Sequence, residues 1–287
     1  MSDNASGAGQ APVSEERFDS VAADYEKYVA PHFLIPATDL IELAALQPGE
    51  KALDVATGPG VAALLAAPKV GATGSIVGVD VSEAMLTIAR QKAEKNGLTV
   101  EFVRGDVQSL DFPEQSFDIV LSNCGLGTTE PEKSLSSIRR MIKPGGRFAL
   151  THWGPTSRPA QAFYELLSKR RVAEVSPRLE WLRRTDLTAR PWTTQCTTPE
   201  ALAALLTEHG FRDVRASARE YAFTFADAEA YLNISLSFPL ARAEFDALSP
   251  GTQRMFKHEF NALMAPFRGA NRSVISNDTI LFAVAFV

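Results

Sequence analysis

The sequence predicts an α/β fold with a doubly wound, mostly parallel sheet of seven strands and helical cap insertions. Between residues 51 and 153, short apolar runs alternate with segments of helical periodicity. Strands that alternate with helices in this way are typical of a parallel sheet covered on both faces. Beyond residue 153 the alternation stops, and two mostly helical stretches interrupt the remaining strands. We expect these stretches to cover a ligand site at one edge of the sheet.

The individual elements follow from periodicity and from the residues that bound them. Apolar runs between turn residues predict strands over 51–56, 75–79, 100–104, 117–122, 147–152, 212–225 and 279–287. Helical spacing predicts two helices within 15–46, and further helices over 61–67, 82–96, 132–142 and 199–209. Ser82 is expected to cap the helix that it begins, and Gly97 to end that helix.

Composition excludes several classes of function. The net charge of -5 argues against nucleic-acid binding, which needs a basic face. The two cysteines, Cys124 and Cys196, lack a metal-binding spacing, so no metal site is expected. No apolar run is long enough to insert stably into a membrane, and the polar N-terminus predicts a disordered tail rather than a targeting segment. These features predict a cytoplasmic protein.

A glycine-rich loop within "ALDVATGPGVAALLA" (residues 52–66) indicates a ligand site between a strand and a helix. Residues 58–63 fit the dinucleotide pattern G-x-G-x-x-G/A, with Asp80 about 20 residues on. Asp54 argues against a dinucleotide, because its carboxylate would repel a pyrophosphate at the mouth of the loop. At about 4 Å that repulsion costs about 4 kcal/mol at an effective dielectric near 20. A ligand with an ammonium and a sulfonium would be attracted instead, which favours S-adenosylmethionine.

Two further acids follow at equal spacing along the chain. Asp54, Asp80 and Asp106 each stand at the end of an expected strand, and they are 26 residues apart. Ligands of open α/β sheets bind at the carboxyl ends of the strands. The three carboxylates can therefore line one crevice and contact successive parts of one ligand.

Four motifs in order carry a family resemblance: "LDVATGPG", "GVDVSEAML", "RGDVQSLDFPEQSFDIVLSN" and "RRMIKPGGRFAL". They resemble the class I S-adenosylmethionine-dependent methyltransferases, which have a Rossmann-like fold. The closest group is that of the ubiquinone/menaquinone C-methyltransferases (type 11), and the resemblance covers about residues 15 to 153. The segment "RFDSVAADYEKY" is similar to that group's N-terminal helix, whose aromatic residue closes over the cofactor and is expected here to be Tyr25.

The resemblance assigns residues to the methionine and ribose ends of the cofactor. Asp54 and the backbone of Ala56, Gly58 and Gly60 would hold the methionine end, and Asp80 would accept from the ribose hydroxyls. Ala56 departs from the pattern, because a glycine is commoner there. We expect a negative φ at Ala56, which alanine adopts without strain.

The resemblance also assigns the adenine and methyl ends. Val81 and Met85 would flank the adenine, and Asp106 would accept from its amino group with Val107 alongside. Asn123 would stand where the methyl group emerges, as a cofactor contact and a candidate catalytic residue. Structural roles stay open for Asp106 and Asn123 as turn residues, for Asp80 as a helix cap and for Tyr25 as a packing aromatic.

Two histidines are candidates for a general base, because histidine titrates near neutral pH. His152 ends the fifth expected strand, and His32 follows the first helix. The aromatic residues of the two insertions favour a hydrophobic or aromatic acceptor, although the same residues could simply pack the cap. These aromatics are Phe163, Tyr164, Trp181, Trp192, Tyr231 and Phe238.

The expected organisation joins these parts into one enzyme. A tail (1–14) precedes N-terminal helices over the cofactor (15–48) and the S-adenosylmethionine-binding core (49–153). A first cap insertion (154–198), a core helix and strand (199–226), a second insertion (227–270) and a terminal strand (271–287) follow.

The predicted function is methyl transfer to the oxygen, nitrogen or carbon of a small molecule, governed mainly by positioning. A cofactor-binding protein that catalyses a non-methylating rearrangement or cyclisation is the alternative. An NAD-dependent oxidoreductase is a further one. A homodimer is left open.

Overall fold

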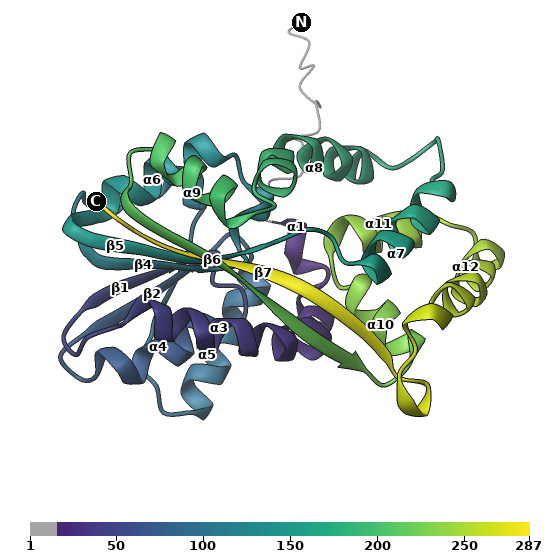
Figure 1. The fold of residues 1–287 in the computed structure, drawn as a ribbon, viewed down its shortest axis with the longest axis horizontal. Coiled ribbons are helices and arrows are strands. Elements are labelled where there is room, and N and C mark those ends of the chain that lie inside the picture. Colours follow the sequence, from purple (N-terminus) through teal and green to yellow (C-terminus); the bar gives the residue numbers. More distant parts are fainter. Residues whose placement is uncertain (1–15) are drawn as a thin grey trace, which may run out of the picture.

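A single seven-stranded sheet forms the centre of the molecule (Figure 1). The computed structural model describes the backbone of residues 16–287 and the side chains of 17–186, 192 and 194–287, so the tail predicted over 1–14 lies outside the described residues. The strands run in the order β3-β2-β1-β4-β5-β7-β6. Only β7 is antiparallel to its neighbours, so the predicted fold class is confirmed.

The strands are bounded as follows: β1 (Lys51–Val55), β2 (Ser75–Asp80), β3 (Glu101–Arg104), β4 (Phe117–Asn123), β5 (Ile142–Trp153), β6 (Arg212–Phe225) and β7 (Val274–Phe286). The sequence predicted all seven, but it made β5 and β7 too short. β5 begins within the expected turn before residue 147, and β7 begins five residues before 279. The antiparallel β7 places its N-terminal end beside the carboxyl ends of the parallel strands.

Helices cover both faces of the sheet and extend beyond it. The bounds are α1 (Glu16–Asp19), α2 (Ala22–Asp24), α3 (Ala30–Ala44), α4 (Val61–Val70), α5 (Glu83–Lys95), α6 (Pro131–Met141), α7 (Arg158–Lys169), α8 (Pro177–Gln195), α9 (Pro199–Glu208), α10 (Ala228–Ser235), α11 (Pro239–Asp246) and α12 (Pro250–Leu263). A π-helical turn, η1 (Tyr25–Val29), joins α2 to α3, and short 3-10 turns lie at 107–109 (η2), 126–128 (η3), 265–267 (η4) and 270–272 (η5). The N-terminal region is therefore one nearly continuous helical path from 22 to 44 rather than two separate helices.

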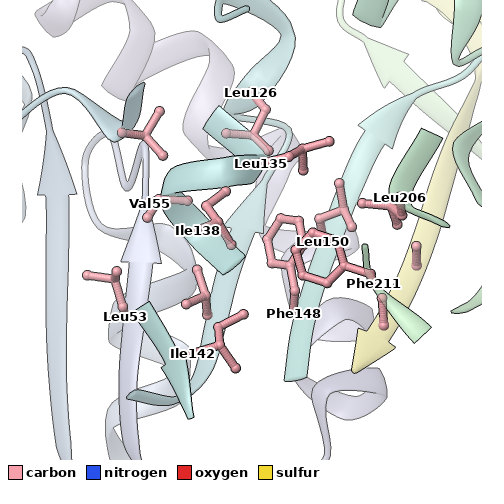
Figure 2. Packing of buried hydrophobic residues seen from close by; sticks show 14 of the residues in the cluster. Leu53, Val55, Leu126, Leu135, Ile138, Ile142, Phe148, Leu150, Leu206 and Phe211 are labelled. Atoms are coloured by element: carbon pink, nitrogen blue, oxygen red, sulfur yellow. The ribbon is translucent and has the colours of Figure 1, made fainter. Parts of the chain in front are cut away.

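Apolar side chains fill the space on each face of the sheet. On one face, residues of α6 and α9 pack on the strands, as Leu135, Ile138 and Leu206 do around Phe148 and Phe211 (Figure 2). On the other face, α3, α4 and α5 cover the same strands. A separate apolar cluster joins α7, α10, α11 and α12 to the end of β6. The cap thus has its own core and sits beyond the carboxyl edge of the sheet.

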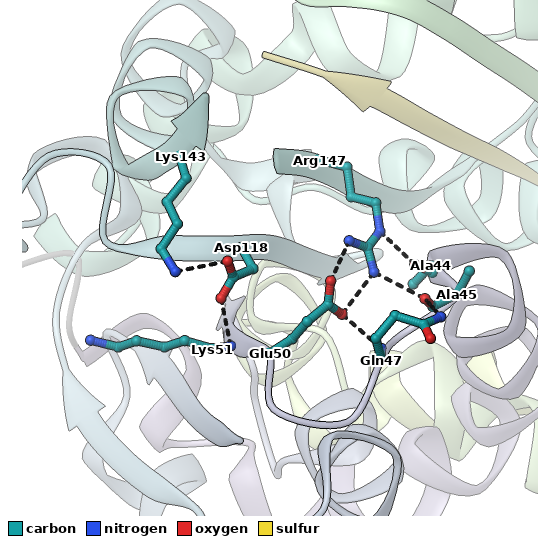
Figure 3. A network of polar contacts seen from close by, with 8 residues as sticks. All are labelled: Ala44, Ala45, Gln47, Glu50, Lys51, Asp118, Lys143 and Arg147. Carbon is teal, nitrogen blue, oxygen red and sulfur yellow. Dashed lines mark hydrogen bonds and ion pairs between the residues drawn. The ribbon is translucent and has the colours of Figure 1, made fainter. Parts of the chain in front are cut away.

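A network of ion pairs and hydrogen bonds joins residues at the opposite edge of the sheet, where the parallel strands begin (Figure 3). Arg147 makes two bonds of 2.7 and 2.9 Å to Glu50, and its Nε donates to the Ala44 carbonyl at 2.7 Å. Burial alone would raise the pKa of Glu50, but the Arg147 bonds lower it below its usual value. Asp118 bridges Lys143 and the backbone of Lys51 nearby. This network stabilises the scaffold at a distance from the carboxyl edge.

Candidate functional site

A cavity of about 600 Å³ lies at the carboxyl edge of the sheet, between the strand ends, the N-terminal helices and the cap. Its volume falls within the range of about 300–1,000 Å³ that is typical of small-molecule sites. The sheet order reverses between β1 and β4, where open α/β sheets bind their ligands. Of the predicted cofactor residues, the following line the cavity: Tyr25, Asp54, Ala56, Gly58, Asp80, Val81, Met85, Asp106, Val107 and Asn123.

Asp54 presents a carboxylate that the protein only half satisfies. Its Oδ2 accepts from the Thr57 hydroxyl at 2.6 Å and from the Ala63 amide at 3.0 Å. Its Oδ1 is buried and has no hydrogen-bond partner within the described part of the chain. Burial raises the pKa of Asp54 to about 7. A cationic group of a ligand would satisfy this oxygen and stabilise the charged form, so the residues present fit the ammonium of S-adenosylmethionine.

Asp80 ties the glycine-rich loop to the end of β2. Its Oδ2 accepts from the Gly58 amide at 2.8 Å, and its Oδ1 accepts from the Ser82 amide at 3.0 Å. Burial raises the pKa of this carboxyl as well. Each oxygen keeps a lone pair for a ligand, so Asp80 can accept from a diol while it holds the loop. The Ser82 side chain accepts from the Met85 amide at 3.2 Å, which confirms the predicted helix cap.

One residue of the loop differs from its prediction. Ala56 has a φ of 52°, in the left-handed region, where the prediction was a negative φ. That conformation costs about 1–2 kcal/mol for a residue other than glycine. Gly60 is not among the residues that line the cavity, and its cofactor contact stays a prediction. Its φ of 81° starts α4, and a Cβ there would stand 3.0 Å from that of Ala89, so packing explains this glycine.

Asp106 combines a structural contact with a place at the cavity. Its Oδ1 accepts from the Gln108 amide at 2.9 Å and so begins the short 3-10 turn over 107–109. The Gln108 side chain in turn accepts from the Glu130 amide at 2.9 Å. The structural role left open for Asp106 is therefore present, and its contact with an adenine remains a prediction.

Asn123 and Tyr25 stand where the strand ends meet the N-terminal helices. Asn123 accepts from the Thr151 hydroxyl at 2.7 Å and donates to the Phe33 carbonyl at 3.4 Å. The Tyr25 ring stacks on that of Phe33, with centroids 6.1 Å apart, and meets Phe238 edge-on at 6.0 Å. Tyr25 thus packs between a core helix and the cap while it lines the cavity.

His152 does not reach the cavity, so the prediction of a general base at this residue is withdrawn. It is 1% exposed, and its Nε2 lies 2.9 Å from the Trp192 carbonyl on α8. Burial lowers its pKa to about 4. The prediction that Trp192 contacts the acceptor is also wrong. Its side chain is fully buried in the core, and its indole nitrogen donates to the Thr129 hydroxyl.

We expect His152→Gln to reduce stability while it preserves turnover. His152 has a folded-state pKa below its usual 6.5, so it stabilises the fold above pH 6.5 and loses this contribution as pH falls toward about 4. The loss amounts to about 3 kcal/mol at 1.36 kcal/mol per pKa unit. Denaturant unfolding between pH 7 and 4 should therefore show a weaker pH dependence in the variant. If the folded variant turned over about 100-fold more slowly, the catalytic role would be restored.

Other cavity residues were not singled out from the sequence. Arg17 directly precedes the expected helical stripe, where nothing marks it as buried. Asp278 lies near the start of β7, and only the antiparallel direction of that strand brings it to the carboxyl edge. Phe223 and Phe225 end β6 and line the same chamber. The sequence contained the residues, but the strand order that gathers them depends on long-range pairing.

The comparisons with known proteins agree with this site. Residues 46–185 match the family model of a methyltransferase domain. The ubiquinone/menaquinone biosynthesis C-methyltransferase UbiE of Ectopseudomonas mendocina is 36% identical over 125 residues, which cover 42% of this chain and 49% of that protein. Residues 46–185 of the chain are therefore similar to a methyltransferase domain, and the chain shares sequence with the UbiE C-methyltransferases. S-adenosylmethionine fits this domain, because its ammonium would satisfy the unpartnered oxygen of Asp54.

Solved structures show the same fold over most of this chain. A protein from Bacillus halodurans superposes with a TM-score of 0.56 at 22% identity, covering 87% of this chain and 97% of that one. Phosphoethanolamine N-methyltransferase 2 of Haemonchus contortus, in complex with S-adenosylhomocysteine, gives 0.54 at 18% identity, covering 94% and 58%. The chain spans about half the length of the curated relatives that it matches. The likeness is therefore strongest in the cofactor-binding part.

The part of the chain that the structure describes contains neither a metal-binding cluster nor a membrane-spanning helix. Among the described residues, no three of the His, Cys, Asp and Glu side chains are placed to hold a metal ion. Within the same part of the chain, none of the helices has the length and apolar character needed to cross a bilayer.

Proposed function

We propose that this methyltransferase acts on a small aromatic acceptor with an ionisable hydroxyl group, and that His32 is the general base. The bound cofactor supplies an electrophilic methyl group on a positively charged sulfur. The chain's own residues align the acceptor, exclude water and receive its proton. The relatives named as C-methyltransferases favour transfer to a ring carbon, and transfer to the oxygen would use the same base.

The contact of His32 with the Tyr28 carbonyl, at the wall of the cavity, is the observation that carries this proposal. Its Nδ1 lies 2.9 Å from the Tyr28 carbonyl, which only accepts, so Nδ1 must carry a hydrogen. Burial lowers the pKa of His32, and the hydrogen bond to Tyr28 and the nearby Asp278 only partly oppose this effect. The neutral ring therefore has its free lone pair on Nε2. His32 lines the cavity, so this nitrogen can take the proton of an acceptor hydroxyl.

The chamber around His32 suits a flat, apolar acceptor. The imidazole stacks on Phe225 at 4.8 Å and meets Phe223 edge-on at 5.6 Å. Further aromatic rings line the same cavity: Phe33, Trp153, Phe163, Tyr164, Trp181, Tyr231 and Phe238. Aromatic pairs contribute about 0.5–1.5 kcal/mol beyond the area they bury. These walls support an aromatic acceptor, which they would hold by stacking and edge contacts.

His32→Gln should slow turnover by about 100- to 10,000-fold, which is the usual contribution of a general base. In the unaltered protein, activity should rise with pH through a pKa below 6.5, and the variant should lose this limb of the profile. The measurement is release of S-adenosylhomocysteine, together with the gain in product mass, for a series of phenols. Each phenol is paired with its methyl ether, which has no proton to lose.

Equal turnover of the phenols and their methyl ethers would contradict the proposed base. Consumption of a substrate in the presence of the cofactor, without any gain in mass, would favour the non-methylating alternative. His209→Gln is a suitable control, because His209 bonds to Glu132 on the surface and does not line the cavity.

A further inference from the structure

We propose that Arg17 forms a carboxylate-binding subsite of the cavity, which takes the carboxylate of the cofactor's amino-acid end or one carried by the methyl acceptor. This inference rests on the proposed function, because both ligands are those of a methyl transfer. Arg17 is the first residue of the segment "RFDSVAADYEKY", in which the family resemblance assigns a role only to Tyr25.

Arg17 is a buried cation that has no ion-pair partner among the described residues. The residue is only 7% exposed, and its Nε has no hydrogen-bond partner among the described residues. It also makes no ion pair with any described residue. Removing a charge from water costs several kcal/mol unless a partner compensates it. Buried polar groups are nearly always satisfied, so an unsatisfied one calls for a missing partner.

The position of Arg17 directs it toward the cap. Asp19, two residues on in α1, bonds to Ser82 and to the Ala84 amide at the start of α5. Side chains two residues apart point to nearly opposite sides of a helix. Arg17 therefore faces away from α5, and it lines the cavity together with Trp181 and Asp186 of α8.

Neighbouring charges leave the subsite open to one anionic group. Asp186 attracts Arg17 electrostatically, but the two form no ion pair, so their charged groups stand apart in the cavity. Arg171 also lines the cavity, but its guanidinium is already paired with Glu244 at 3.0 Å. A planar guanidinium binds a carboxylate through two parallel bonds. A doubly charged phosphate would be repelled more strongly by Asp186, which favours a carboxylate.

The test compares ligands that differ by one carboxylate, in the unaltered protein and in Arg17→Met. The first pair is S-adenosylhomocysteine and its decarboxylated analogue, which keeps the ammonium. The second pair is benzoate and benzyl alcohol, each titrated in the presence of S-adenosylhomocysteine. In one of the two pairs, we expect Arg17→Met to weaken the binding of the ligand that has the carboxylate by about 10- to 100-fold, which is the size of effect expected for a charged hydrogen bond. The binding of the ligand without the carboxylate should weaken by less than about threefold.

The pair that responds identifies the source of the carboxylate. Arg17→Lys keeps the charge but loses the planar fork, so it should show a smaller loss and remain informative if Arg17→Met does not fold. Arg254→Met removes the same charge from α12, outside the cavity, and should change neither pair. Equal binding of both pairs by the unaltered protein and the Arg17 variants would overturn the subsite. Failure of the unaltered protein to bind S-adenosylhomocysteine would instead contradict the proposed function.

Discussion

Asp54→Asn should greatly weaken the binding of the cofactor. It should also make the ligand-free protein more stable above pH 7. The buried Oδ1 of Asp54 is the only oxygen of this carboxylate left for the cofactor's ammonium. Removing one member of a buried charge pair costs about 2–5 kcal/mol, so the Kd of S-adenosylhomocysteine should rise by about 30- to several thousand-fold. Isothermal titration calorimetry measures this change directly.

The stability effect of the same substitution has the opposite sign. The folded-state pKa of Asp54 is raised to about 7 from 3.8, so ionised Asp54 destabilises the fold. This penalty is absent below about pH 4 and grows as pH rises to about 7. Removing the charge should therefore raise the free energy of unfolding by about 1–3 kcal/mol at pH 8, after the cost of an unpaired amide. At pH 4 only the cost of the amide remains, so the variant should be less stable than the unaltered protein there.

Asp118→Asn is the matched control, because Asp118 lies at the opposite edge of the sheet and bonds to Lys143. It should leave cofactor affinity unchanged and should not stabilise the protein. An Asp54→Asn protein that binds S-adenosylhomocysteine as tightly as the unaltered protein would refute the ammonium site.

Gly125→Ala should disturb the glycine-rich loop, because Gly125 lies directly beside it in the segment after β4. A Cβ at Gly125 would stand 2.5 Å from the Cβ of Ala56 and 2.9 Å from its carbonyl oxygen. The φ of Gly125 is -87°, which alanine adopts easily, so the effect is purely steric. We expect a loss of about 1–3 kcal/mol in the free energy of unfolding, which is the usual cost of overpacking, and weaker cofactor binding.

Ala56→Gly provides the partner for a double-mutant cycle. Alone, it should stabilise the protein by about 1 kcal/mol, because glycine adopts the left-handed φ of this position without strain. In this background, Gly125→Ala should cost less, because the clash between the two Cβ atoms is gone and only the contacts with the Ala56 carbonyl and the Ser122 hydroxyl remain. Strict additivity of the two substitutions would show that the residues do not press on each other.

The local signals of the sequence predicted much of the cofactor side. Asp54, Asp80 and Asp106 sit at the ends of strands whose apolar runs are easy to recognise, and all three line the cavity. The predicted negative φ of Ala56 was wrong. Residue type alone does not fix φ where the backbone packs closely against another segment, as Ala56 does against Gly125.

The acceptor side depends on contacts that periodicity does not encode. His152 has a suitable place at a strand end, but its ring turns toward α8, whose packing is set by the whole cap. Asp278 becomes a cavity residue only because β7 is antiparallel. Arg17 lines the cavity together with Trp181 of α8, and the bond between Arg178 and Ser20 joins the start of α8 to the residue after α1. Such long-range arrangements require the structure.

A crystal structure with S-adenosylhomocysteine bound tests the assignment of the cofactor site most directly. We expect the ligand's ammonium at Oδ1 of Asp54, its ribose at Asp80 and its adenine beside Met85 and Asp106. Its sulfur should then face the chamber that contains His32. A ligand bound in the reverse direction, or outside this cavity, would contradict the assignment.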